Sequence, residues 1–169
     1  MPELVLMRHA KSDWDAPYDR DIRRPLSARG RRDAAAMGAA LTAMGAAPDF
    51  VLTSPAVRAH ATAEMAAAGG GWNAEVLVVD SLYGGGPGAV LDALGELPDP
   101  CRRALVLGHE PTWSETVGLL IGGGEVRMPT AAGAGLEVLV RSWRAIAPGT
   151  CRLHWLLPPR VLDRVRPAP

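Results

Sequence analysis

Two histidines and two arginines are the side chains best suited to chemistry in this sequence. Arg8 and His9 follow the apolar run "LVLM" (4–7), Arg58 follows "LTSPAV" (52–57), and His109 follows "LVLG" (105–108). A guanidinium is permanently charged and holds a phosphate or carboxylate through two parallel hydrogen bonds. A neutral imidazole is a nucleophile or an acid–base group near neutral pH. The four residues together predict a site for an anionic substrate.

Other kinds of site explain these residues less well. His9 and His109 with Glu110 or Asp13 could bind zinc, but neighbouring arginines would repel a divalent cation. The glycine-rich stretch "GGGPGAV" (84–90) precedes a helix start, yet it has no lysine after it and no Walker pattern. Phosphoryl transfer with histidine as the nucleophile uses all four residues. The arginines and the second histidine would neutralise the phosphoryl oxygens, so no metal or other cofactor is expected.

The elements that must position these residues alternate between strands and helices. Apolar runs predict strands at 3–7, 50–53, 75–79 and 103–108, with a late antiparallel pair at 135–140 and 152–157. Helical patterns occupy about 28–45, 55–68, 87–97 and 111–121. This order predicts an α/β fold, a three-layer α/β/α sandwich with a mostly parallel central sheet. Ligands of such sheets bind beyond the carboxyl ends of the strands, where the reactive residues fall.

Local signals place two of the helix starts. Ser27 is expected to cap the first helix, in which Met37, Leu41 and Met44 share one face. Pro55 is expected in the first turn of the second helix. His60, in an alanine-rich helix, and His154, in an apolar strand, are expected to be structural rather than catalytic.

Length and composition limit the function. The 169 residues carry 18 basic and 18 acidic side chains, so nothing indicates binding to nucleic acid or to an anionic membrane. No apolar run has membrane-spanning length, and the amino terminus does not resemble a signal peptide. Cys101 and Cys151 are expected to be reduced thiols of a cytoplasmic protein. We expect one domain over 1–165 and a loose tail at 166–169.

Three motifs together resemble the histidine phosphatase superfamily, the phosphoglycerate-mutase-like proteins. "LMRHAKS" (6–12) is similar to its Arg-His-Gly signature, with Ala10 in place of glycine. "LTSPAVRAHATAE" (52–64) resembles its Ser-Ser-Pro, Arg-Ala element, and "LVLGHEP" (105–111) its Gly-His-Asn-Pro element. "RRPLSARGRRDAAAMG" (23–38) also matches, and the short length resembles the small phosphohistidine-phosphatase branch. The resemblance implies the phosphoglycerate-mutase-like fold.

The resemblance also implies residue roles. His9 would be the nucleophile that is phosphorylated during turnover. Arg8 and Arg58 would bind the phosphoryl oxygens, and His109 would donate to the same oxygens. Ser12 lies at the position of a serine that the mutases carry near the pocket, so it is a candidate substrate-binding residue.

The chain departs from the family at the general acid. Many members have a glutamate after the third strand, where Asp80 is the only carboxylate here. Glu110 is the other candidate for the general acid. It directly follows His109, and a distant branch of the family places its acid directly after the histidine that matches His109. A substrate with an easily expelled leaving group, such as imidazole, needs less help from an acid. Asp15 replaces a family asparagine and receives no binding role, and Lys11 is a possible contact for an acidic substrate.

The predicted function is therefore a cytoplasmic, metal-independent phosphatase with a covalent phosphohistidine intermediate. Its substrate would be a phosphohistidine on a protein or a small phosphorylated metabolite. The alternative is a weak or inactive module of the same fold that binds phosphate or a phosphoprotein. Substrate identity and oligomeric state stay open.

Overall fold

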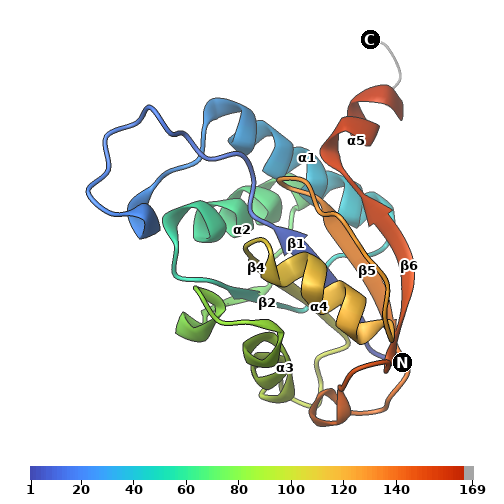
Figure 1. The fold of residues 1–169 in the computed structure, drawn as a ribbon. Coiled ribbons are helices and arrows are strands. Elements are labelled where there is room, and N and C mark those ends of the chain that lie inside the picture. The colour runs from blue at the N-terminus through green and yellow to red at the C-terminus, as the bar shows by residue number, and fades with distance from the viewer. Residues whose placement is uncertain (166–169) are drawn as a thin grey trace.

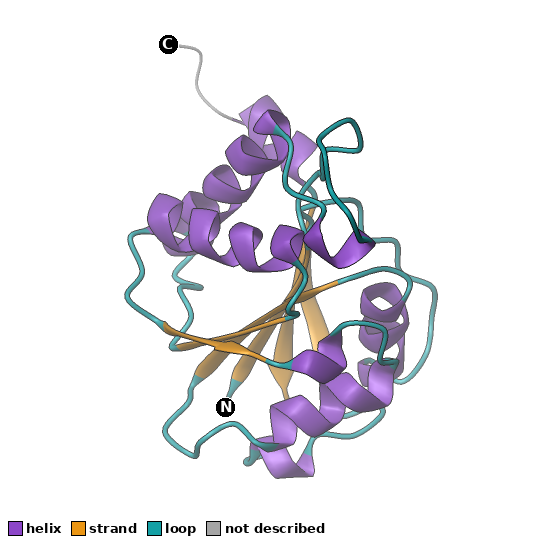
Figure 2. Cartoon of the chain, turned by 90° about the vertical axis from the view of Figure 1, so that its left-hand side faces the viewer, coloured by secondary structure: helices purple, strands orange, loops and turns teal. Residues whose placement is uncertain are grey.

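A six-stranded mixed sheet forms the centre of the molecule (Figures 1 and 2). The computed structural model describes residues 1–165. The strand order is β3-β2-β4-β1-β5-β6, in which β1, β2, β3 and β4 are parallel and β5 and β6 are antiparallel additions at one side. The strands are β1 (Glu3–Arg8), β2 (Phe50–Thr53), β3 (Glu75–Val78), β4 (Arg103–Gly108), β5 (Gly133–Val138) and β6 (Cys151–Leu157).

Helices cover both faces of this sheet, which confirms the predicted three-layer α/β/α sandwich. One layer contains α1 (Ala28–Ala43), α2 (Val57–Gly70) and α5 (Pro159–Val165), and the other α3 (Pro87–Gly95) and α4 (Thr112–Leu120). Short 3₁₀ turns lie at Asp21–Arg23, Asp80–Leu82 and Trp143–Ala145.

The central strand β1 shows why its sequence is apolar without interruption. Leu4 and Leu6 point into the core beneath α3 and α4, whereas Val5 and Met7 point into the core beneath α1 and α2. Successive side chains of a strand face opposite sides, so a strand with helices on both sides needs apolar residues throughout.

The first helix begins as predicted and ends earlier. The Ser27 hydroxyl accepts a hydrogen bond from the Gly30 N–H at 3.0 Å, which caps α1. Met37 and Leu41 are buried on one face, whereas Met44 lies at the C-cap beyond the helix and is 47% exposed. The helix ends at Ala43, and Gly45 adopts a φ of 72° that turns the chain away.

Two other expectations need correction. Pro55 lies outside α2, which begins at Val57, because the backbone first makes a turn in which the Ser54 hydroxyl accepts from the Ala56 N–H at 3.2 Å. Helix α5 has no counterpart among the predicted helices. The late antiparallel pair is confirmed as β5 and β6, although β5 lies slightly earlier than expected.

Two further features that bear on function are membrane-spanning helices and metal-binding groups. Within residues 1–165 no helix has the length and apolar character needed to cross a bilayer. The same residues contain no group of three His, Cys, Asp or Glu side chains that could hold a metal ion. The predicted tail at 166–169 lies outside the described residues, and the single-domain boundary stays a prediction.

Candidate active site

The carboxyl ends of β2, β4 and β1 lie side by side and bring the reactive residues together (Figure 1). The His9 N–H donates to the Gly108 carbonyl at 2.9 Å, and the Ser54 N–H donates to the Leu107 carbonyl at 3.1 Å. Position 108 requires glycine, because a Cβ there would overlap the buried ring of Trp113. The three strand ends thus form one rigid base for the site.

His9 is held as a neutral imidazole with a defined tautomer. Its Nδ1 lies 2.7 Å from the Ala10 carbonyl, which can only accept, so Nδ1 carries the proton and Nε2 keeps its lone pair. The side chain is buried, and its ring centroid is 5.1 Å from that of His109. Burial lowers the pKa of His9 to about 3, and the positive charges of Arg58 and Arg8 act in the same direction.

A threonine on α2 fixes the backbone beside His9. The fully buried Thr62 hydroxyl accepts from the Ala10 N–H at 3.0 Å and donates to the Arg58 carbonyl at 2.6 Å. One side chain therefore connects the segment that follows the nucleophile candidate to the helix that carries Arg58.

His109 lies between a hydroxyl and an aromatic ring. Its Nε2 is 2.8 Å from the Ser54 Oγ, and the ring of Tyr83 meets it edge-on with centroids 5.5 Å apart. Burial lowers the pKa of His109 to about 4, followed by the charge of Arg58, so this imidazole is also neutral near pH 7.

Arg24 and Arg58 share the carboxylate of Asp21. Arg58 donates from Nη1 to the Asp21 carbonyl at 2.8 Å and from Nη2 to its Oδ2 at 2.9 Å. Arg24 donates from Nη2 to the Asp21 Oδ1 at 3.0 Å and stacks on the ring of Trp14 at 3.4 Å. Tyr83 donates its hydroxyl to Asp21 at 3.0 Å. Burial alone would raise the pKa of Asp21, but the Tyr83 hydrogen bond and the two guanidiniums lower it.

Five buried nitrogen atoms in this cluster have no hydrogen-bond partner. They are Nε of Arg8, Nε and Nη1 of Arg24, Nε of Arg58 and Nδ1 of His109, and they are all the unpartnered buried side-chain atoms that residues 1–165 contain. Leaving a buried donor unpaired costs about 1–3 kcal/mol, and more for a charged group. Such a concentration of unpaired donors is typical of a site that binds an anion.

The remaining candidates lie at different places around this cluster. Glu110 is half-buried near Arg8, and its Oε1 accepts from the Ser114 hydroxyl at 2.9 Å. Burial raises the pKa of Glu110 against the opposing effects of Ser114 and Arg8. Ser12 is buried and its backbone bridges Leu26, but none of the described side-chain hydrogen bonds joins its hydroxyl to the cluster.

Three acidic or basic residues considered from the sequence are exposed. Asp80 begins the 3₁₀ turn after β3, and Asp15 lies in a turn closed by Asp13. Lys11 has its backbone packed against the start of α1, while its side chain is exposed. No described side-chain hydrogen bond or ion pair joins any of them to His9 or His109.

Sequence reasoning missed Asp21, Arg24 and Tyr83. Arg24 falls within the stretch at 23–38 that carries the family resemblance, so the motif was a signal for it. Asp21 and Tyr83 are far apart along the chain and follow no pattern of spacing, and only the fold brings them together.

Comparisons with known proteins identify the family. The family model for the histidine phosphatase superfamily (branch 1) matches residues 4–83. An uncharacterised protein of Mycobacterium tuberculosis is 36% identical over 165 residues, covering 91% of this chain and 100% of the relative. This chain belongs to the histidine phosphatase superfamily.

Solved structures narrow the branch of the superfamily. The protein histidine phosphatase SixA complexed with tungstate has a TM-score of 0.81 and 25% identity, over 95% of this chain and 99% of that one. A Nakamurella multipartitia protein assigned by name to the SixA phosphohistidine phosphatases has a TM-score of 0.80 and 28% identity, over 94% and 96%. The superfamily member described here is therefore a phosphatase of the small phosphohistidine-phosphatase-like branch.

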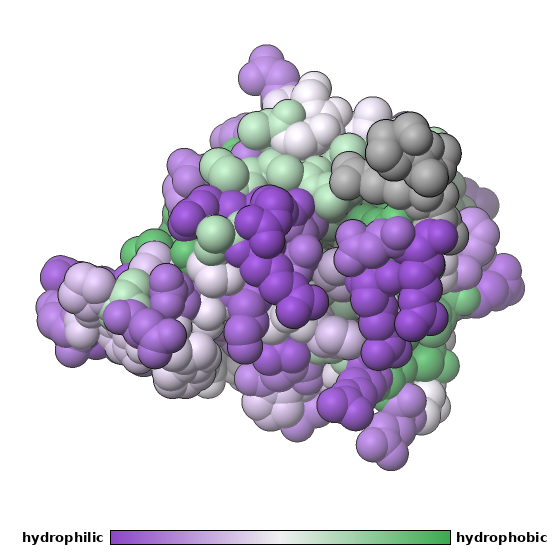
Figure 3. Space-filling view, turned by 90° about the horizontal axis from the view of Figure 1, so that it is seen from above, coloured by the Kyte–Doolittle hydropathy of each residue, from purple (hydrophilic) through white to green (hydrophobic). Residues whose placement is uncertain are grey.

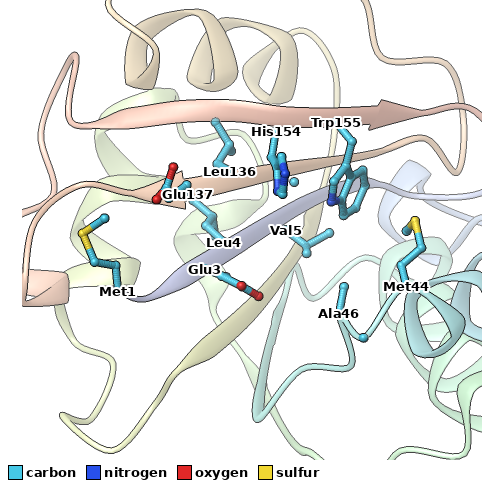
Figure 4. Close-up of a pocket in the computed structure, with 12 residues that line it drawn as sticks. Met1, Glu3, Leu4, Val5, Met44, Ala46, Leu136, Glu137, His154 and Trp155 are labelled. Carbon is cyan, nitrogen blue, oxygen red and sulfur yellow. The ribbon is translucent and has the colours of Figure 1, made fainter.

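A separate pocket of about 500 Å³ lies at the opposite, amino end of β1 (Figure 4). His154 and Trp155 of β6 line it together with Glu3 and Glu137. Both carboxylates are paired with arginines, Glu3 with Arg103 and Glu137 with Arg152. The other histidine outside the site, His60, is partly exposed on α2 and lies 3.8 Å from Glu64. Neither His60 nor His154 takes part in the cluster around His9.

Proposed function

We propose that this member of the superfamily is a metal-independent phosphatase that transfers a phosphoryl group through His9. The observation that supports the proposal is the set of five unpartnered buried nitrogens on Arg8, Arg24, Arg58 and His109. A tetrahedral oxyanion presents several acceptors to such donors at once. Three guanidiniums supply the positive charge that a metal ion supplies in other phosphoryl-transfer sites.

The tautomer of His9 defines the chemical step. Nε2 of His9 would attack phosphorus, and the bond from phosphorus to the leaving group would break. Water would then attack the phosphohistidine, break the phosphorus–nitrogen bond and release inorganic phosphate. Because burial keeps the His9 pKa at about 3, the lone pair is available throughout the physiological range.

His109 and the arginines would hold the oxygens during both steps. If the Ser54 hydroxyl donates to Nε2 of His109, the proton of this imidazole is on Nδ1, the atom without a partner. Nδ1–H would then donate to a phosphoryl oxygen. Asp21 would not bind phosphate itself but would position Arg58 and Arg24.

Glu110 is the better-placed general acid of the two candidates. Its half-buried carboxyl has a raised pKa, lies on the Arg8 side of the site and is oriented by Ser114. In the protonated form it would give its proton to the leaving group. Asp80 is exposed and has no described bond to the site.

The substrate would be a phosphohistidine on a protein or a small phosphorylated molecule, as for the phosphatases that this chain resembles. SixA was solved with tungstate, an oxyanion of the shape that the cluster would accept. We further propose that the enzyme works in the cytoplasm, with Ser12 near the substrate. The two free, buried cysteines, Cys101 and Cys151, agree with a reducing compartment.

One experiment tests the covalent route. Wild type, His9→Asn and the control His60→Asn would hydrolyse p-nitrophenyl phosphate in buffer with EDTA, and an alkaline quench would preserve phosphohistidine for mass spectrometry. We expect turnover and a phosphoryl group on His9 in wild type and the control. His9→Asn should be slower by about 10³-fold or more and carry no label.

Retention of wild-type turnover in His9→Asn, or a label on another residue, would contradict the mechanism. Loss of turnover on adding EDTA would contradict metal independence. A protein that only binds phosphate would bind tungstate but show neither turnover nor label.

A further inference from the structure

A second hollow, of about 670 Å³, lies beside the candidate active site. It is lined by Arg8, Glu110, Arg127 and Arg160, together with the segment 128–130, Leu156 of β6 and Pro158. We name it the Arg127–Arg160 pocket. The phosphatase chemistry proposed above does not use Arg127 or Arg160, so the role of these side chains is open.

The Arg127–Arg160 pocket and the site around His9 share a wall. Arg8 directly precedes His9, and Glu110 directly follows His109. Nη1 of Arg8 donates to the Met128 carbonyl at 3.0 Å, and the Ala131 N–H donates to the His9 carbonyl at 3.1 Å. A ligand group in the pocket would therefore be adjacent to a phosphoryl group held at His9.

The wall made by residues 128–130 is fixed from the other side as well. The Ser114 hydroxyl donates to Glu110 and also accepts from the Met128 N–H at 3.2 Å. Ser114 thus holds both the carboxyl of Glu110 and the backbone of the pocket wall in place. The pocket is preformed where it meets the proposed acid.

The charge of the pocket is positive. Three guanidiniums face one carboxylate, and none of the ion pairs within residues 1–165 includes Arg8, Arg127 or Arg160. Figure 3 shows strongly hydrophilic residues gathered on the upper face of the molecule. Three guanidiniums and one carboxylate leave the hollow with a net positive charge, which favours a carboxylate or phosphate ligand.

We propose that the Arg127–Arg160 pocket binds a second anionic group of the substrate, a carboxylate or a phosphate on the leaving-group side. The inference rests on the proposed function, because Glu110 protonates the leaving group and lines this pocket. Arg127 and Arg160 are then specificity-determining residues. Substrates whose only anionic group is the transferred phosphoryl group are hydrolysed without contacts to Arg127 or Arg160.

Matched substrates test this proposal. The kcat/KM of phenyl phosphate would be compared with those of 2-, 3- and 4-carboxyphenyl phosphate and of 1,4-phenylene bisphosphate. The carboxylate and phosphate arms show which anion the pocket prefers. The proteins would be wild type, the double variant Arg127→Gln/Arg160→Gln, and the control Arg141→Gln, which changes an exposed arginine outside the pocket.

We expect the kcat/KM of wild type to be about tenfold higher for at least one substrate with a second anionic group than for phenyl phosphate. Tenfold is about the scale of one charge-assisted contact. The double variant should lose this preference while its kcat/KM for phenyl phosphate changes by less than about threefold. The control should behave as wild type, and added salt should reduce the preference.

The proposal would be overturned if wild type had the same kcat/KM for phenyl phosphate as for the substrates with a second anionic group. It would also be overturned if the double variant kept the preference. In both cases hydrolysis of phenyl phosphate continues, so the proposed function stands. No hydrolysis of any of these esters by folded wild type would overturn the proposed function and this inference together.

Discussion

The Thr62 hydroxyl gives the sharpest test of how the fold supports His9. Replacing Thr62 by valine keeps the shape of the side chain but removes the only acceptor that the structure shows for the Ala10 N–H, 3.0 Å away. The Ala10 residue is fully buried, so this donor would stay unpaired at a cost of about 1–3 kcal/mol. The Arg58 carbonyl, the other partner, keeps its position within α2.

Thr116 provides a matched control. It is also fully buried in a helix, and its hydroxyl donates to the carbonyl four residues earlier, that of Thr112, at 2.7 Å. The main difference is that Thr116 accepts from no described donor. Thr116→Val should therefore change stability by much less than Thr62→Val, since only a local bond to an already bonded carbonyl is lost.

Urea unfolding measures the difference. With a slope of about 2 kcal/mol per M, the Thr62→Val midpoint should fall below that of Thr116→Val by about 0.5–1.5 M. The kcat for p-nitrophenyl phosphate should also fall in Thr62→Val, because the Ala10 carbonyl that orients His9 belongs to the loosened segment. Equal midpoints for the two variants, with unchanged kcat, would refute this account of the site.

Three further predictions follow from the same geometry. First, the folded pKa values of about 3 for His9 and about 4 for His109 lie below the ordinary value of 6.5, so the unfolded chain binds protons first as the pH falls. The free energy of unfolding should decrease from pH 6.5 to about 4 by up to about 1.4 kcal/mol per pH unit for each imidazole. The urea midpoint of His109→Gln should therefore fall less steeply with decreasing pH than that of wild type. Second, Gly108→Ala should destabilise by about 1–3 kcal/mol or more, because the new methyl overlaps Trp113, and an unchanged melting temperature would contradict the packing. Third, Ser54→Ala should lower kcat by about tenfold or more through loss of the bond that orients His109, and a wild-type kcat would exclude that role.

The candidate site illustrates how far sequence patterns reach. Arg8, His9 and His109 follow apolar strands, and parallel strands end at one edge of a sheet, so the sequence alone predicts that they lie close together. The same reasoning could not find Asp21, which begins a short 3₁₀ turn outside the predicted strands and helices. Its contacts with Arg58 and Tyr83 span 37 and 62 residues of sequence, and only the path of the folded chain sets such contacts.

The errors in the helices have a local origin. Met44 fits the apolar face of α1 by spacing, but the chain leaves the helix at Ala43 and Gly45 before that position can be buried. Pro55 suits a first helical turn, yet the Ser54 side chain stabilises a preceding turn that delays α2. In both places a local turn competes with the helix, at Gly45 after α1 and at Ser54 before α2.

By itself, the sequence determined the layered α/β architecture, the strand ends followed by His9 and His109, the place of Arg58 shortly after the strand at 50–53, and the family. These follow from periodicity and from short motifs, which depend on residues close together in the chain. The tertiary structure alone decided the tautomer of His9, the carboxylate shared by Arg24 and Arg58, and the arginines gathered beside Glu110. Hydrogen bonds, burial and charge act over a few ångströms in space, and residues distant in sequence become neighbours only when the sheet and its two helical layers have formed.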